Sequence, residues 1–254
     1  MDKLKCIDLS DSHILTITPD FAGIPMLEQL CLSGCINLVE IHPSIGQLRR
    51  LEVLELKGCK SLTNLPSMTP EMQALKILNL CGCSKIRKIP EFKGIMKRLS
   101  ELYLGMTAIE KLPSSIDCLI ALTLLNLEHC ENLECLPSNM DSLRSLKKLD
   151  LSGCLKLANL PENLGKINCL KELDLCSCYK LQSLSELPST VRYINAQNCY
   201  SLELKPSLAL RRLSMSVLQP CLELRLYNES RGNVAFTILY HYLQVIYSLS
   251  LLNC

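Results

Sequence analysis

The chain has 254 residues, of which 48% are hydrophobic and 20% are charged, and it carries a net charge of +2. This hydrophobic content is enough for a large core and excludes a globally disordered protein. The small net charge argues against nucleic acid as the main partner. Leucine accounts for 55 residues, whereas aromatic residues make up only 4%. A core that depends on one aliphatic residue type is typical of a repeat protein, in which one position recurs many times.

The N-terminal segment from Met1 to Asp8 has no apolar stretch of the kind found in secretory signals. We therefore expect a reducing, cytoplasmic environment, in which disulfides are rare despite the 16 cysteines of the chain. The one glycosylation sequon, Asn228-Glu229-Ser230, is expected to remain unmodified for the same reason.

The pattern L-x-x-L-x-L-x-x-C recurs along residues 1–204 at intervals of 21 to 24 residues. Complete copies begin at Leu27, Leu51, Leu75, Leu122, Leu146 and Leu170, copies without the cysteine begin at Leu4 and Leu99, and a last variant begins at Val191. This period lies within the range of leucine-rich repeats. We therefore predict a leucine-rich repeat array of about nine repeats over residues 1–204, followed by a non-repeat tail over residues 205–254.

Each repeat divides into a strand and a return segment. The leucines at the fourth and sixth positions enclose one outward residue, as in a short strand with one buried face. A proline such as Pro66 follows a second apolar pair and fixes φ for the return. The return carries apolar residues three apart, such as Ile45, Leu48 and Leu51, which suits a 3₁₀ or short α-helical turn. The prediction is an α/β leucine-rich repeat solenoid, or horseshoe, with a concave parallel β-sheet and an irregular, 3₁₀ or short helical convex side.

Seven cysteines share the ninth position of a repeat, which is a small, buried site at a turn. They are Cys35, Cys59, Cys83, Cys130, Cys154, Cys178 and Cys199. We predict that they stack into a structural column rather than forming disulfides. The pairs Cys81-x-Cys83 and Cys176-x-Cys178 have a spacing that zinc could use. However, the members of each pair are expected to face opposite sides of the strand, so we expect no metal and no cofactor.

Two repeats depart from the pattern. The repeat that begins at Leu99 is one residue short and lacks the cysteine, so Thr107 or Ala108 is expected to fill the ninth position. This interruption is expected to alter the curvature locally. The repeat that begins at Leu170 is three residues short, as terminal repeats often are.

The tail differs in charge as well as in period. Residues 205–254 carry a net charge of +3, which leaves −1 for residues 1–204. Residues 234–254 contain no Lys, Arg, Asp or Glu and are long enough to span a membrane. Polar residues such as His241 and Gln244, and the lack of a charged stop, instead favour a buried pair of strands or sequence foreign to the usual gene product.

The sequence contains no motif typical of an enzyme, neither a phosphate-binding loop nor a hydrolase or metalloprotease signature. The four histidines lie in different repeats or in the tail, so no Cys–His pair follows from their spacing. We therefore expect no catalytic residue and no enzymatic activity.

The outward side chains of the strands remain as candidates for binding, because they would line the concave face. The candidates are Asp8, Glu55, Lys57, Glu101, Tyr103, Asn126, Glu128, His129, Lys148, Asp150, Glu172, Asp174 and Tyr193. This mixed and mildly acidic surface suits a protein partner, with Tyr103 and Tyr193 as aromatic anchors. Solvated strand residues without a partner would give the same pattern.

Several segments of the chain resemble one family. They are residues 7–10 (IDLS), 18–25 (TPDFAGIP), 38–46 (LVEIHPSIG), 58–62 (GCKSL), 102–109 (LYLGMTAI) and 187–191 (LPSTV). Residues 1–204 thus resemble the repeat domain of plant intracellular immune receptors of the TIR, nucleotide-binding and leucine-rich-repeat type. The resemblance implies a cytoplasmic or nuclear protein that senses pathogen effectors or holds a receptor inactive. Its implied partners are an effector, a guarded host protein or the receptor's own nucleotide-binding domain.

The TIR and nucleotide-binding modules of that family have no counterpart in the sequence, and no functional residue of the family can be assigned to this chain. A fragment or a truncated form of such a receptor is therefore expected. A cytosolic adaptor or substrate-recognition subunit, as in ligases and small-GTPase scaffolds, is the alternative. An extracellular receptor would be expected to have a signal peptide, several sequons and capping disulfides, and the sequence predicts none of these.

Overall fold

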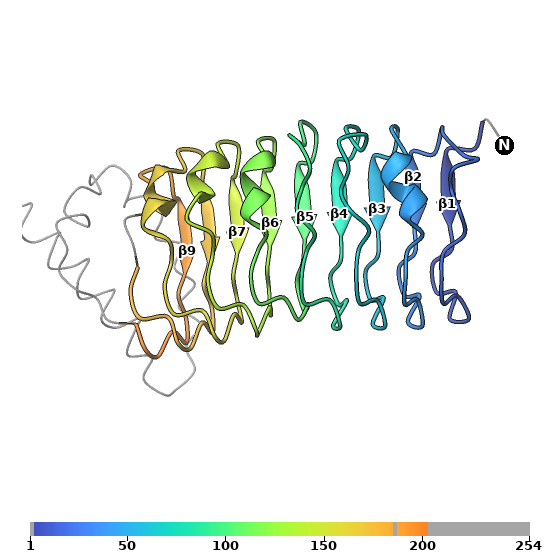
Figure 1. The fold of residues 1–254 in the computed structure, drawn as a ribbon. Helices are drawn as coiled ribbons and strands as arrows, with labels where there is room; N and C mark the ends of the chain where they lie inside the picture. Colours follow the sequence, from blue (N-terminus) through green and yellow to red (C-terminus); the bar gives the residue numbers. More distant parts are fainter. Residues whose placement is uncertain (1–2, 185–186, 203–254) are drawn as a thin grey trace, which may run out of the picture.

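The computed structural model describes residues 3–184 and 187–202. Over these residues the chain winds into successive coils, each of which contributes one three-residue strand to a single parallel sheet (Figure 1). The strands are β1 (Cys6–Asp8), β2 (Gln29–Cys31), β3 (Val53–Glu55), β4 (Ile77–Asn79), β5 (Glu101–Tyr103), β6 (Leu124–Asn126), β7 (Lys148–Asp150), β8 (Glu172–Asp174) and β9 (Tyr193–Asn195). Their order in the sheet is their order in the sequence, so the predicted leucine-rich repeat solenoid is confirmed.

Every strand pairs with the next without a shift in repeat position. Leu30 in β2 lies opposite Leu54 in β3, which in turn lies opposite Leu78 in β4. These central residues are at most 1% exposed because both neighbouring coils cover them. Ile7 in β1 and Ile194 in β9, at the two ends of the described sheet, are only partly buried. Stacking in register therefore produces the continuous aliphatic core that a single coil could not form.

The return segments form the convex side. Four of them contain 3₁₀ helices, which lie along the upper side of Figure 1. They are η1 (Pro43–Gln47), η2 (Ser114–Cys118), η3 (Met140–Ser142) and η4 (Glu162–Lys166). The predicted 3₁₀ turns are thus confirmed, and Ile45, Ile116 and Leu164 anchor three of them in the core. Between η1 and η2 the described returns have no 3₁₀ segment, and Met68 and Phe92 instead form a parallel bridge.

The cysteine column is confirmed, and its hydrogen bonds explain the choice of residue. Each thiol is fully buried and donates to the sixth-position carbonyl of the preceding coil at Sγ···O distances between 3.0 and 3.3 Å. Thr107 takes the ninth position in its coil, but its hydroxyl donates to Leu104 of the same coil at 2.7 Å. A thiol is small enough for the core and still satisfies a buried carbonyl. We call these seven cysteines the cysteine ladder.

The eighth position of every coil adopts a left-handed backbone conformation, which the sequence analysis missed. Glycine occupies it at Gly34, Gly58, Gly82 and Gly153, and other residues occupy it at Asp11, Met106, His129, Ser177 and Asn198. The φ values lie between 54° and 77°. Residues other than glycine rarely adopt the left-handed region. The glycine that recurs at the eighth position was therefore the feature of the sequence that could have predicted this conformation.

The tail prediction, including the apolar segment 234–254 and the sequon, falls outside the described residues. Within the part of the chain that the structure describes, no helix is both long and apolar enough to cross a membrane.

Candidate functional site

The thirteen predicted binding residues all lie on the strands or in the loops directly after them, and none of them is buried. Positions 2, 3 and 5 of each coil belong to or adjoin the strand, and position 7 follows it. We call the outward side chains at these four positions the concave surface. The core leucines at positions 1, 4 and 6 face the other way. The fold therefore presents polar side chains from distant repeats on one continuous surface.

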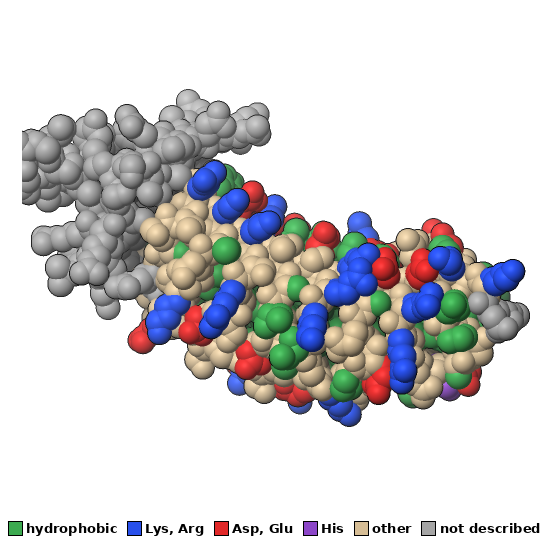
Figure 2. Space-filling model, turned by 90° about the horizontal axis from the view of Figure 1, so that it is seen from above, with side chains coloured by type: hydrophobic (Ala, Val, Ile, Leu, Met, Phe, Trp, Pro, Cys, Tyr) green, Lys and Arg blue, Asp and Glu red, His purple; other side chains and the backbone are tan. Residues whose placement is uncertain are grey.

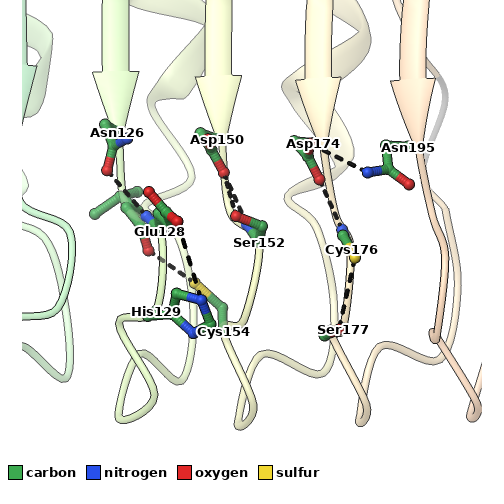
Figure 3. Close-up of polar contacts among 11 residues, drawn as sticks. Asn126, Glu128, His129, Asp150, Ser152, Cys154, Asp174, Cys176, Ser177 and Asn195 are labelled. Carbon is green, nitrogen blue, oxygen red and sulfur yellow. Dashed lines mark hydrogen bonds and ion pairs between the residues drawn. The ribbon is translucent and has the colours of Figure 1, made fainter.

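Several fifth-position candidates close the turn after their own strand. The side-chain Oδ1 of Asp8 accepts from the backbone N–H of Ser10 at 2.9 Å. Hydrogen bonding to the Ser10 side chain, together with this backbone contact, holds the pKa of Asp8 below its usual value. The same contact occurs at Asn126, Asp150 and Asp174, with N···O distances between 2.9 and 3.1 Å (Figure 3). These side chains have a local structural role because they satisfy a backbone donor at the strand end.

The central coils contain a cluster that is not used in this way. Tyr103 in β5 donates from its hydroxyl to Glu101 Oε2 at 2.7 Å, and both side chains are half-buried. Burial and the Glu101 contact raise the pKa of Tyr103 to about 12. Burial also raises the pKa of Glu55 in β3, which lies two strands away across Asn79. With the exposed Lys57, these residues combine an aromatic ring with charges of both signs.

The last coils carry the remaining candidates. Lys148 in β7 forms an ion pair with Glu172 in β8 at 3.5 Å. Tyr193 in β9 is 47% exposed. His129 lies in the turn beyond β6, and its side chain is 52% exposed. Its Nε2 atom is 4.0 Å from Oε1 of Glu128 (Figure 3). Apart from Asp8 in β1, the structure thus divides the candidates between the central cluster and the coils of β6 to β9, and His129 lies at the margin of the concave surface.

In each of the two Cys-x-Cys pairs, the two cysteines occupy different environments. Cys83 belongs to the buried cysteine ladder, whereas Cys81 is half-buried and burial raises its pKa. Cys178 is likewise in the core, and Cys176 lies in the turn. Among the described residues, no group of three or more His, Cys, Asp or Glu side chains could hold a metal ion.

One cavity, of about 530 Å³, was not anticipated. It lies beside the loops that follow the strands and is lined by Thr63, Ser84, Lys85, Arg87, Ala108, Glu110 and Asn132. The missing residue of the fifth coil explains it, because only Ala108 separates Thr107 from the buried Ile109. In the preceding coil two residues separate Cys83 from Ile86. The shorter loop recedes between its neighbours, so the shortened repeat was the signal in the sequence.

Comparisons with known proteins agree with this architecture. The Leucine Rich Repeat family model matches residues 145–167. Disease resistance protein RPV1 of Vitis rotundifolia is 50% identical over 42 residues, which are 16% of this chain and 3% of that protein. The match therefore spans only a small part of that relative.

Solved structures also resemble the chain. The leucine-rich repeat domain of the type III effector XopL has 25% identity and a TM-score of 0.56, with 71% of this chain and 72% of that one covered. A leucine-rich repeat protein of Leptospira interrogans has 20% identity and a TM-score of 0.42, with 83% and 64% covered. The repeat period, the parallel sheet in sequence order and the likeness to the XopL domain show that the described residues fold as a leucine-rich repeat solenoid, a fold typical of protein-interaction modules.

Proposed function

We propose that this domain recognises a protein partner through its concave surface as part of plant innate immunity. The observation that carries the proposal is the central cluster of Glu55, Lys57, Glu101 and Tyr103. Its side chains are accessible, and the backbone turns do not use them. A partly buried tyrosine among charges of both signs has the character of a binding hot spot.

The immune role is supported by the plant-receptor resemblance and by the short match to a grape disease resistance protein. On this proposal the domain senses a pathogen effector or a guarded host protein, or it contacts the nucleotide-binding domain of a receptor and keeps that receptor inactive. It acts in the cytoplasm or nucleus, without catalysis or a cofactor. The other candidate residues of the concave surface contribute to the shape and charge of the contact.

A binding assay with the full chain tests this proposal. The purified chain is presented with a panel of pathogen effectors, with the nucleotide-binding domain of a TIR-type receptor and with a ligase adaptor subunit. A partner bound by the wild type should lose about tenfold or more in affinity with the double variant Glu55→Ala/Tyr103→Ala, because hot-spot truncations each cost more than about 1 kcal/mol.

The matched control is the double variant Lys93→Ala/Lys97→Ala, which alters two exposed residues of a convex return. It should bind like the wild type. Equal losses in both variants, or no loss in the first, would contradict recognition by the central cluster. Binding to the ligase adaptor subunit alone would support the adaptor function instead.

A further inference from the structure

The last three coils present a row of like charges at their second position. The row consists of Lys147, Lys171 and Arg192, and we call it the basic row. All three residues are exposed. Lys171 N–H donates to the Lys147 carbonyl at 2.8 Å, and Arg192 N–H donates to the Lys171 carbonyl at 2.8 Å. The sheet therefore fixes the three backbones about 4.8 Å apart from one to the next.

The first four coils treat the same column differently. There two lysines and two glutamates follow in the order Lys5, Glu28, Glu52 and Lys76, and each lysine pairs with the glutamate of an adjacent coil. Lys5 Nζ forms an ion pair with Glu28 Oε1 at 2.9 Å, and Lys76 Nζ forms one with Glu52 Oε2 at 2.7 Å. Neutral residues, Ser100 and Thr123, fill the next two coils. The fold is thus compatible with paired charges or with no charge at this position.

The basic row has no such compensation. Within residues 3–184 and 187–202, none of its three members forms an ion pair with a carboxylate. Several Lys and Arg side chains are visible on the surface at this end of the array, with Asp and Glu side chains among them (Figure 2). Like charges held at one strand spacing repel each other, so the row does not stabilise the coils that carry it. An anionic partner would remove that repulsion.

We infer that the basic row binds a short acidic segment of a protein partner, which lies across the last three coils. This inference rests on the proposed function, since it assigns part of the partner's chemistry to one end of the concave surface. Three cations spread over about 10 Å match a run of two to four carboxylates in either an extended or a helical segment.

The surroundings favour a peptide over nucleic acid. Glu172, Asp150 and Asp174 belong to β7 and β8, the strands that follow Lys147 and Lys171 in the chain. These carboxylates confine the positive charge to the row itself, whereas a phosphate backbone carries a charge on every nucleotide and needs a broad cationic surface. An acidic segment can place its few carboxylates on the row and direct other side chains towards Tyr193.

The test uses the full chain and a fluorescent hexaglutamate peptide, with binding measured by anisotropy at low salt. In the row variant Lys147→Ser/Lys171→Thr/Arg192→Thr, the new residues are those that already occupy this column at Ser100 and Thr123. The matched control Lys60→Ser/Lys88→Thr/Lys93→Thr removes the same charge from exposed residues elsewhere. We expect the row variant to lose about tenfold in affinity and the control less than about twofold, as three exposed ion pairs would give.

Binding to the wild type should also weaken as salt is added, because the contacts are exposed. Equal affinity of the wild type and the row variant would overturn the inference. So would tighter binding of a single-stranded oligonucleotide of equal charge, if the row variant lost that binding. If the wild type does not bind hexaglutamate while the Glu55/Tyr103 variant still loses its partner, the basic row is excluded and the proposed function stands. Hexaglutamate binding through the row, with no partner bound at the central cluster, supports the inference and contradicts the proposed function.

Discussion

At the residue scale, the strand-end side chains show that an outward polar residue can serve the fold. Asp150 Oδ1 accepts from the backbone N–H of Ser152 at 3.0 Å and from its hydroxyl at 2.6 Å. We expect Asp150→Ala to lower the free energy of unfolding by about 1 kcal/mol, because a turn donor loses its acceptor. Asp150→Asn should keep most of the wild-type stability, since Asn126 makes the same contact in its own coil. Urea denaturation of the purified variants measures both effects.

Lys148→Ala is the control in the same strand. It removes only an exposed ion pair, so its cost should stay below about 0.5 kcal/mol. If Asp150→Ala is as stable as the wild type, the turn does not depend on this side chain. Asp150 would then be available for partner binding alone.

At the element scale, the cysteine ladder predicts a loss of stability in alkali. Burial raises the pKa of Cys130 to about 11, of Cys178 to about 12 and of Cys199 to about 11, from an ordinary value of 9.0. Above pH 9 the unfolded chain releases these protons while the folded chain keeps them. The stabilisation is therefore complete below pH 9 and falls as the pH rises towards 11. Between these pH values the free energy of unfolding should fall by about 1.4 kcal/mol per pH unit for each thiol, or by about 4 kcal/mol per pH unit for the three together.

Urea denaturation in a reducing buffer, at about pH 8 and about pH 10, measures this slope. Replacing the three thiols by alanine should lower the stability at both pH values and flatten the pH dependence. Alanine at the exposed Cys135 and Cys169 should leave the slope unchanged. A wild-type protein whose stability is the same at both pH values would show that the ladder thiols are not buried as described.

At the scale of the whole molecule, the array has one continuous core in which each coil depends on its neighbours. Leu151, directly after β7, is fully buried in that core. We expect Leu151→Asp to cost about 3–5 kcal/mol, because it buries a charge without a partner. For a domain of this size the melting temperature should fall by about 10 °C or more. Circular dichroism on heating measures the change.

Ile14→Asp is the matched control, because Ile14 is 95% exposed. Its melting temperature should stay within about 2 °C of the wild-type value, as for an ordinary surface substitution. A native-like transition in Leu151→Asp would mean that the assignment of leucines to the core is wrong.

The repeat pattern predicted more of the fold than of the candidate surface. The spacing of leucines was sufficient for the parallel sheet, and the spacing of Ile45 and Leu48 was sufficient for the 3₁₀ return. Thr107 was predicted as one of two residues able to replace a ladder cysteine. The role of each outward residue as a binding contact stays a prediction. The sequence could not separate Asp150, which closes a turn, from Glu55, which does not, because both occupy the fifth position.

The sequence by itself determined the coil, because a period of about 24 residues with leucine at three fixed places allows only one way to bury those leucines. Only the tertiary structure decided how neighbouring coils share hydrogen bonds and charges. Residues that are one repeat apart in the chain lie one strand spacing apart in space. Ion pairs such as Glu52–Lys76 therefore form only when the coils stack. The same stacking placed Lys147, Lys171 and Arg192 side by side and produced the cavity beside the shortened loop, since both depend on the residues of the adjacent coil.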